Sequence, residues 1–254
     1  MLLIVSPAKT LDFDYPVPEL SVTRPAFAKD AAALIDGLRT LPVEAIRKLM
    51  SISPELAALN HARYQDWRPR APARTTRAAL LAFRGDVYLG MRAETFSAEE
   101  FAFAQRHLRI LSGLYGLLRP LDAIQPYRLE MGTRLANARG RNLYEFWGPR
   151  IADALQAQAR AAGARELVNL ASQEYFRAVA QERLALAVIT PVFKESRGGT
   201  LKIVSFNAKR ARGAMAGFVI RHPLQRAEDL QAFAEDGYRY EPALSCDREW
   251  LFVR

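Results

Sequence analysis

The chain opens with Met1-Leu-Leu-Ile-Val5 and runs directly into Ser6-Pro7-Ala8-Lys9-Thr10. Leu2 to Val5 is a short apolar run that ends before a proline, which is the pattern of a buried strand entering a loop. No basic stretch precedes this run, so it does not resemble a signal peptide, and we expect a cytoplasmic protein. No apolar stretch approaches the roughly 20 residues that a membrane-spanning helix needs, so we expect no membrane partner.

Helices and further strands are expected after this first strand. Ser53-Pro54-Glu55 predicts a helix start, and Ser97-Ala98-Glu99-Glu100 is a capping box that predicts a helix through about Arg109. Other helices are expected at 25–39, 42–50, 148–162, 207–220 and 227–234, and strands at 80–83, 167–170, 186–193, 201–206, 238–240 and 250–253. These elements do not alternate in a regular βαβ rhythm. The sequence therefore predicts an α+β fold, with a mixed sheet and surrounding helices in one domain over residues 1–254.

The charge balance favours a polyanionic partner. The 254 residues include 36 Lys and Arg against 27 Asp and Glu, for a net charge of +9. A basic excess attracts nucleic acid, and that attraction weakens with salt. Two stretches concentrate the charge: residues 101–150 hold eight arginines and three acids, and residues 207–226 hold five cations and no acid. An arginine- and alanine-rich composition is also what a GC-rich coding sequence produces without any functional meaning.

Several classes of site have no support in the sequence. The chain has no GxxxxGK[ST] phosphate loop, no GxGxxG dinucleotide fingerprint and no GxSxG nucleophile elbow. His61, His107 and His222 are far apart and show no metal-site spacing, and Cys246 is the only cysteine, which excludes a disulfide framework. We therefore expect no cofactor and no metal site.

Lys9 and the segment Leu111–Asp122 are the first candidates for function. Lys9 follows a buried strand and lies in a loop, where it can bind phosphate or act as an amine nucleophile; the alternative is an ordinary solvated lysine. In the segment, Gly113 and Gly116 form a turn that we expect to lie between two helices, with Arg109 and Arg119 flanking it. This pattern resembles the helix-hairpin-helix element of DNA repair proteins, with a turn that is one residue longer. The alternative is a structural turn that needs glycine for its backbone geometry.

Three further polar clusters are candidates. Asp122 and Glu130 can supply acid or base function in a cleft, or Glu130 can simply pair with Arg128. Glu174 lies where a strand meets a helix, near Ser172, which is also a plausible helix cap. Lys209 and Arg212 begin a basic helix, where cations oppose the helix dipole unless an anion is near; the alternative is a solvated basic face.

Seven motifs in order resemble the bacterial YaaA family of peroxide-stress-resistance proteins. They run from residue 6 to about residue 213 and so cover most of the chain. The motifs are Ser6-Pro-Ala-Lys-Thr-Leu11, Phe83-Arg-Gly-Asp-Val-Tyr88, Leu111-Ser-Gly-Leu-Tyr-Gly116, Arg119-Pro-Leu-Asp122, Gln125-Pro-Tyr-Arg-Leu-Glu-Met-Gly132, Asn169-Leu-Ala-Ser172 and Ala208-Lys209 with Ala211-Arg-Gly213. The resemblance implies DNA binding through a basic cleft, with a helix-hairpin-helix-like element. It also implies survival of hydrogen peroxide through lower levels of unincorporated intracellular iron.

Three hypotheses follow. In the first, the protein binds single- or double-stranded DNA with little sequence preference, through phosphate contacts from Lys9, Arg109, Gly113, Gly116, Arg119, Arg128, Lys209 and Arg212. In the second, it is an enzyme that acts on a nucleic-acid lesion or nucleotide: Lys9 attacks a sugar carbon, Asp122, Glu130 or Glu174 move protons, and Tyr88, Tyr127 and Tyr175 wall a pocket for a flipped base. In the third, it binds iron through carboxylates that only folding brings together.

Overall fold

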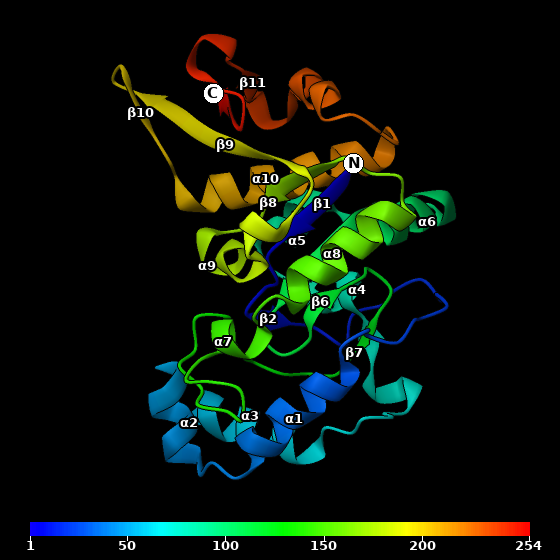
Figure 1. Ribbon diagram of the computed structural model, residues 1–254, viewed down its shortest axis with the longest axis vertical. Coiled ribbons are helices and arrows are strands. Elements are labelled where there is room, and N and C mark those ends of the chain that lie inside the picture. Colours follow the sequence, from blue (N-terminus) through cyan, green and yellow to red (C-terminus); the bar gives the residue numbers. More distant parts are fainter.

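A mixed sheet forms the centre of the computed structural model, which describes residues 1–254 (Figure 1). It has eight strands in the order β11-β12-β9-β8-β1-β5-β6, with β10 paired to β9. Five strands run parallel to one another, in the order β12, β9, β8, β1 and β5. Each remaining strand is antiparallel to its partner, in the pairs β5–β6, β9–β10 and β11–β12. The bounds are β1 (Leu2–Val5), β5 (Leu108–Ser112), β6 (Gly116–Leu118), β8 (Glu166–Leu170), β9 (Ala187–Arg197), β10 (Thr200–Lys202), β11 (Arg239–Tyr240) and β12 (Glu249–Val253).

Helices surround this sheet, and two small sheets extend it. The helices are α1 (Ala28–Arg39), α2 (Val43–Met50), α3 (Pro54–Asp66), α4 (Ala79–Ala82), α5 (Asp86–Met91), α6 (Ala98–His107), α7 (Leu143–Trp147), α8 (Arg150–Ala161), α9 (Gln173–Phe176) and α10 (Ser205–Arg221). The small sheets pair β2 (Thr10–Leu11) with β4 (Phe83–Arg84), and β3 (Arg77–Ala78) with β7 (Ala123–Ile124). The expected α+β fold is confirmed.

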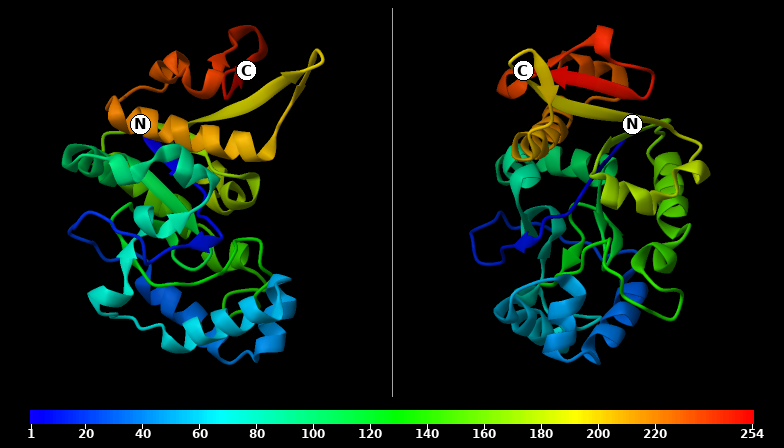
Figure 2. Two further views of the ribbon diagram at one scale, coloured as in Figure 1. Left: turned by 180° about the vertical axis from the view of Figure 1, so that it is seen from behind. Right: turned by 90° about the vertical axis from the view of Figure 1, so that its left-hand side faces the viewer.

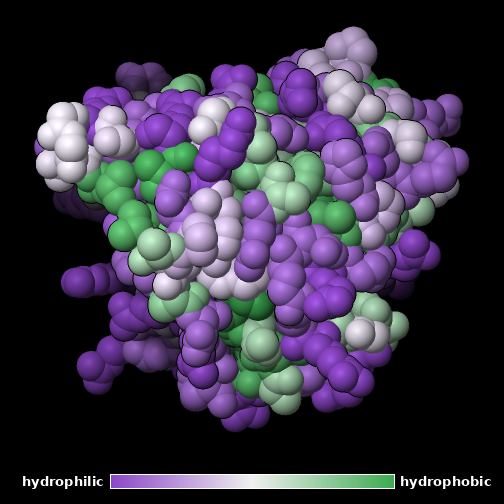
Figure 3. All heavy atoms as spheres, turned by 90° about the horizontal axis from the view of Figure 1, so that it is seen from above, coloured by the Kyte–Doolittle hydropathy of each residue, from purple (hydrophilic) through white to green (hydrophobic).

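The elements are distributed along the long axis of the molecule. Helices α1, α2 and α3 gather at one end, while β9 to β12 and the C-terminus lie at the other, where the β9–β10 hairpin projects (Figures 1 and 2). Seen from that second end, hydrophilic residues cover most of the face and separate smaller apolar areas (Figure 3). No helix combines the length and apolar character needed to cross a membrane.

One hydrophobic core of 68 buried residues runs from Met1 to Phe252. All four residues of β1 are fully buried, because β1 lies between β8 and β5 inside the sheet. In this parallel arrangement Val5 pairs with both Ile110 and Leu170, so the loops after β1 and β8 leave the sheet at the same edge. This edge positions the residues of the candidate site.

Several local predictions are confirmed, among them two helix starts and two strand pairs. Ser53 accepts a hydrogen bond from the backbone N–H of Leu56 at the start of α3, and Ser97 and Glu100 form the expected capping box at α6. The predicted hairpin around Gly198 joins β9 to β10, and β11 pairs with β12. These signals are local, so the sequence alone is enough to read them.

Three local predictions are wrong. The strand expected at 201–206 is shorter, because β10 ends at Lys202 and helix α10 already begins at Ser205. The stretch 80–83 was expected as a strand, but α4 covers most of it and only Phe83 belongs to β4. Helix α6 ends at His107, and Leu108–Ser112 is the buried strand β5. Gly113 and Gly116 therefore belong to an antiparallel β5–β6 hairpin and not to a turn between helices. Two helices joined by a short turn occur elsewhere, at α2 and α3.

Candidate functional site

A cleft of about 450 Å³ opens at the edge where β1 and β8 end. Its lining comes from five separate segments: the loop after β1, the end of β8 with α9, the residues around Gly85, the extended segment 127–130, and α10. The carboxyl ends of adjacent parallel strands are a common place for ligand sites in sheets. The volume lies within the roughly 300–1,000 Å³ of typical ligand pockets. We call this cavity the cleft.

The structure brings six of the candidate residues together here. Their positions in the sequence span two hundred residues, but all of them line the cleft. They are Lys9, Arg128, Glu130, Glu174, Lys209 and Arg212. The cleft therefore combines cations from the loop after β1, from the 127–130 segment and from α10.

Glu130 lies between two of these cations. Its Oε2 atom is 2.9 Å from Lys9 Nζ, and its Oε1 atom is 2.9 Å from Arg128 Nη2. The Lys9 side chain is 64% exposed and that of Glu130 is 25% exposed, so the Lys9 pair faces solvent while Arg128 is packed more deeply. Nε of Arg128 is buried and has no hydrogen-bond partner. The pairing of Glu130 with Arg128 that the sequence allowed is thus present, and the pair lies in the cleft.

Glu174 has a partly structural role. Its Oε1 atom accepts a hydrogen bond of 2.9 Å from the backbone N–H of Gly132, and its backbone carbonyl accepts one from Tyr144. The hydrogen bond from Gly132 joins α9 to the end of the segment that carries Arg128 and Glu130. Ser172 and Ser6 make a similar link between the loops after β8 and β1, because the Ser172 backbone N–H donates to Ser6 Oγ at 2.9 Å.

Helix α10 carries Lys209 and Arg212 into the cleft. It can do so because its glycines let it pack closely against α5: a Cβ added at Gly213 would lie 1.7 Å from the Val87 carbonyl oxygen. A Cβ at Gly90 of α5 would lie 2.1 Å from the Arg210 carbonyl oxygen. Only a residue without a side chain fits such distances. The glycine that ends the Ala211-Arg-Gly213 motif therefore places the arginine before it.

Arg212 has an unusual environment for a cation. Burial lowers the pKa of its guanidinium, and desolvation is the only cause of this shift. No carboxylate is paired with it, in contrast to Lys9 and Arg128. A desolvated cation without a partner is costly. An anion beside this guanidinium would offset that cost.

Three tyrosines form the walls of the cleft. Tyr88 donates a hydrogen bond to the Ser6 carbonyl oxygen, and the Tyr127 hydroxyl lies 2.6 Å from Ser112 Oγ. Burial raises the pKa of Tyr88, Tyr127 and Tyr175, so these phenols stay neutral at physiological pH. The cleft therefore combines uncharged aromatic walls with cationic side chains.

Arg84 is a cleft residue that the sequence reading did not single out. It lines the cleft with Asp86, its guanidinium lies 4.1 Å from the centre of the Tyr15 ring, and Asp12 is 3.9 Å from it. The signal that could have found it is the Phe83–Tyr88 motif, which supplies several lining residues. Nothing in the local pattern distinguishes Arg84 from the many other arginines.

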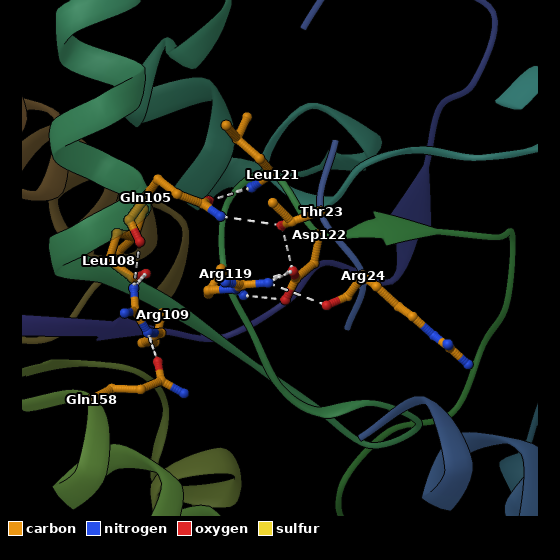
Figure 4. Close-up of polar contacts among 9 residues, drawn as sticks. All are labelled: Thr23, Arg24, Gln105, Leu108, Arg109, Arg119, Leu121, Asp122 and Gln158. Atoms are coloured by element: carbon orange, nitrogen blue, oxygen red, sulfur yellow. Dashed lines mark hydrogen bonds and ion pairs between the residues drawn. The ribbon is translucent and has the colours of Figure 1, made fainter. Parts of the chain in front are cut away.

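Arg109 and Asp122, which the sequence analysis names as candidates, are buried and lie outside the cleft. Arg109 is 4% exposed in β5, where it donates to Gln158 and to the carbonyl of Gln105 (Figure 4). Burial lowers its pKa to about 10. Asp122 is 1% exposed and accepts hydrogen bonds from Thr23 and Arg119. Neither residue can reach a ligand in the cleft, since both are enclosed by protein.

Gly113, Gly116 and Arg119 are also placed differently from the expectation. Both glycines are buried: a Cβ at Gly113 would lie 2.3 Å from the Leu129 carbonyl oxygen, and Gly116 has a φ of +66° against the Trp147 ring. Gly113 lets the hairpin pack closely against the segment that carries Arg128 and Glu130, and Gly116 lets it pack against Trp147 of α7. Arg119 forms an ion pair with Asp122 at 2.9 Å and does not line the cleft.

No three His, Cys, Asp or Glu side chains are grouped in a way that could hold a metal ion.

The comparisons with known proteins agree with the motifs. A family model described as peroxide stress protein YaaA matches residues 1–244. Relatives described as UPF0246 proteins include one from Saccharophagus degradans, 51% identical over 254 residues, which spans 100% of this chain and 99% of the relative. Others are from Teredinibacter turnerae, 50% identical over 254 residues with 100% and 99% covered, and from Burkholderia cenocepacia, 52% identical over 256 aligned residues with 100% and 98% covered. The chain therefore belongs to the peroxide stress protein YaaA family.

Proposed function

We propose that this protein binds DNA in the cleft, through the phosphate backbone and with little sequence preference. The observation that carries the proposal is the unpaired, desolvated Arg212 guanidinium beside Lys209, in a cleft that holds more cations than carboxylates. A phosphate supplies the anion that this guanidinium lacks. Phosphate contacts position nucleic acid but carry no sequence information, so single or double strands of unrelated sequence are all expected to bind.

The proposal extends to the role of the family in peroxide stress. DNA binding in the cytoplasm would be the molecular activity behind peroxide resistance and the lower level of unincorporated iron that the family resemblance implies. Cells that carry a cleft variant in place of the wild-type chain should then lose both effects together. Retained peroxide resistance in a variant that no longer binds DNA would separate the two and contradict this extension.

The direct test is DNA binding across salt concentrations. Each phosphate contact that is neutralised contributes about 0.9 to the slope of log K against log salt on duplex DNA. The double variant Lys209→Gln/Arg212→Gln should bind more weakly and lose up to about 1.8 from that slope. The matched control is Arg160→Gln/Arg165→Gln, which removes two exposed cations outside the cleft. A flat salt response of the wild type, or identical behaviour of the two double variants, would refute cleft binding.

A second candidate function is a lyase-type reaction on damaged DNA. The observation that favours it is the Lys9–Glu130 contact of 2.9 Å in a cleft walled by Tyr88, Tyr127 and Tyr175. Glu130 can take a proton from the Lys9 ammonium, and the neutral amine can then attack the aldehyde carbon of an abasic sugar. The nitrogen–carbon bond forms an imine as water leaves. A flipped base or sugar would occupy the aromatic part of the cleft.

Borohydride trapping tests this second candidate. Borohydride reduces the imine to a stable amine, so wild-type protein and an abasic duplex should give a covalent adduct. Lys9→Ala should abolish the adduct, whereas Lys29→Ala, which removes an exposed lysine of α1, should leave it unchanged. Absence of an adduct with the wild type, or equal adduct with Lys9→Ala, would remove the lyase proposal without affecting the DNA-binding proposal.

A further inference from the structure

A second cavity of about 390 Å³ lies apart from the cleft, and arginine is the only charged residue type that lines it. Arg24, Arg68 and Arg70 contribute the cations, and no Asp or Glu is among the lining residues. We call this cavity the Arg24 groove. In the cleft, Glu130 offsets part of the positive charge, whereas the lining of the groove contains no carboxylate that could do so. Three uncompensated guanidinium groups around one cavity create a local positive potential that favours an anion.

The groove has a fixed floor. Trp67 and Tyr115 are buried behind it and are joined by a hydrogen bond of 3.0 Å from Trp67 Nε1 to the Tyr115 hydroxyl. The Gln125 side chain fixes the connection after α3: its Oε1 atom accepts from the Arg68 backbone N–H at 2.9 Å, and its Nε2 atom donates to the Arg68 carbonyl at 2.7 Å. The arginine-rich connection is therefore held in place at Arg68.

The three guanidinium groups are available to different degrees. Arg68 Nη1 donates to the carbonyls of Gln65 and Trp67, so this group is already oriented. The Arg24 backbone carbonyl accepts a hydrogen bond from Arg119, while the Arg24 side chain extends away from that network (Figure 4). Arg24 and Arg70 are exposed and form no ion pair. A guanidinium can bind phosphate through two parallel hydrogen bonds. The fixed Arg68 group and the exposed Arg24 and Arg70 groups together are therefore suited to bind successive phosphates.

The groove and the cleft share one aromatic wall. Tyr115 lines the groove, Tyr127 lines the cleft, and their ring centres are 5.4 Å apart in an edge-to-face arrangement. The chain also connects them directly, because Gln125 lines the groove and the segment that starts two residues later lines the cleft. The linings of the two cationic cavities are therefore in contact through this pair of buried rings.

We infer that the Arg24 groove binds the phosphodiester backbone of a second nucleic-acid segment, separate from the segment in the cleft. This inference rests on the proposed DNA-binding function. Charge complementarity and the adjacent cationic cleft favour a nucleic acid as the occupant. Two sites on one chain would let the protein hold two strands, or two parts of one bent strand.

Counting bound strands tests the inference. A short oligothymidylate, small enough to occupy a single cavity, is titrated into the full chain at low salt and the stoichiometry is measured by calorimetry. The wild type should bind two strands. Arg24→Gln/Arg70→Gln and Lys209→Gln/Arg212→Gln should each bind one, and the control Arg160→Gln/Arg165→Gln should bind two. Arg24 and Arg70 are exposed and unpaired, so thermal unfolding of the groove variant should match that of the control.

The outcomes separate the two sites. One strand per wild-type chain, with the groove variant behaving as the wild type, would overturn the inference and leave the cleft proposal intact. Loss of a strand in the groove variant but not in the cleft variant would support the groove and contradict the cleft proposal. If the groove variant loses binding of inorganic phosphate but keeps both oligothymidylate strands, the groove is a site for a small phosphate compound and the inference is wrong.

Discussion

Lys9 Nζ lies 2.9 Å from Glu130 Oε2, although 121 positions separate the two residues in the sequence. The pair joins the loop after β1 to the segment that follows β7, and Arg128 binds the other oxygen of the same carboxylate. Glu130 therefore sits where a phosphate would meet both cations. It neutralises part of the cleft charge, and under the proposed function it would compete with the DNA backbone for both cations.

Replacing Glu130 should therefore tighten DNA binding. In Glu130→Gln the side chain keeps its size but loses its charge, so Lys9 and Arg128 become free to contact phosphate. We expect a gain in affinity of up to about fivefold, or about 1 kcal/mol, and a steeper salt dependence. The measurement is duplex binding at several salt concentrations. Glu182→Gln, which makes the same charge change at an exposed position outside the cleft, is the control. Equal effects of the two variants would show that only net charge matters.

Some of the residues that the sequence singled out line one cleft, but the sequence did not predict all of the local fold around them. Motifs marked six residues that all line the cleft, although no local rule could show that folding brings them together: Lys9, Arg128, Glu130, Glu174, Lys209 and Arg212. The run Leu108–Leu118 was read as the end of a helix and a turn, since a short apolar run does not distinguish a buried strand from a buried helix. Its pairing with β1 decides the matter, and that contact spans about a hundred residues.

Arg109 and Asp122 show a second limit of sequence reasoning. Composition counts every arginine as a possible phosphate contact, but it does not show which guanidinium groups face solvent. Arg109 is 4% exposed and binds backbone carbonyls and Gln158 inside the protein. Asp122 is held by Thr23 and Arg119. Such burial depends on tertiary packing, so only the folded structure separates these residues from those of the cleft.

The close contact between α5 and α10 should make Gly213 intolerant of any side chain. A Cβ there would lie 1.7 Å from the Val87 carbonyl oxygen, so Gly213→Ala must move α10 away from α5. We expect a loss of about 1–3 kcal/mol in the free energy of unfolding, as for overpacked cores. DNA affinity should fall as well, because α10 carries Lys209 and Arg212. Denaturant unfolding and DNA titration provide the two measurements.

A second glycine supplies the control for this prediction. Gly37 lies in α1, and no atom lies within 4 Å of the position that its Cβ would take. Gly37→Ala should therefore raise the free energy of unfolding by about 0.5–1 kcal/mol, because alanine loses less backbone entropy in a helix. A stable Gly213→Ala protein with unchanged DNA affinity would show that α10 does not need this close approach.

The buried tyrosines of the cleft should make the fold sensitive to alkali. Burial raises the pKa of Tyr88, Tyr127 and Tyr175 above the ordinary value of 10.0. The unfolded chain then loses phenol protons before the folded chain does. The stability that these groups contribute is complete below pH 10 and is lost as the pH rises through their folded values. Between pH 10 and the folded pKa of each tyrosine, that tyrosine should lower the free energy of unfolding by about 1.4 kcal/mol per pH unit.

Tyr175→Phe checks this pH dependence. The variant lacks one ionisable phenol, so its unfolding free energy should fall less steeply with pH above 10 than that of the wild type. Denaturant unfolding at a series of alkaline pH values gives the slopes, and near-ultraviolet absorbance follows tyrosinate formation. Normal ionisation of all tyrosines near pH 10 in a chain that keeps its folded circular dichroism would contradict the prediction.

Arg212 should strengthen DNA binding but lower the unfolding free energy of the free protein. Its guanidinium is desolvated and has no carboxylate partner, so Arg212→Met, which keeps much of the apolar stem, should raise the unfolding free energy of the free chain by about 0.5–2 kcal/mol. The same variant should bind DNA more weakly and lose about 0.9 from the salt slope. Arg160→Met, at an exposed position of α8, should change neither quantity appreciably. A destabilised Arg212→Met protein would mean that the guanidinium packs favourably without any anion, and the main support for phosphate binding in the cleft would be lost.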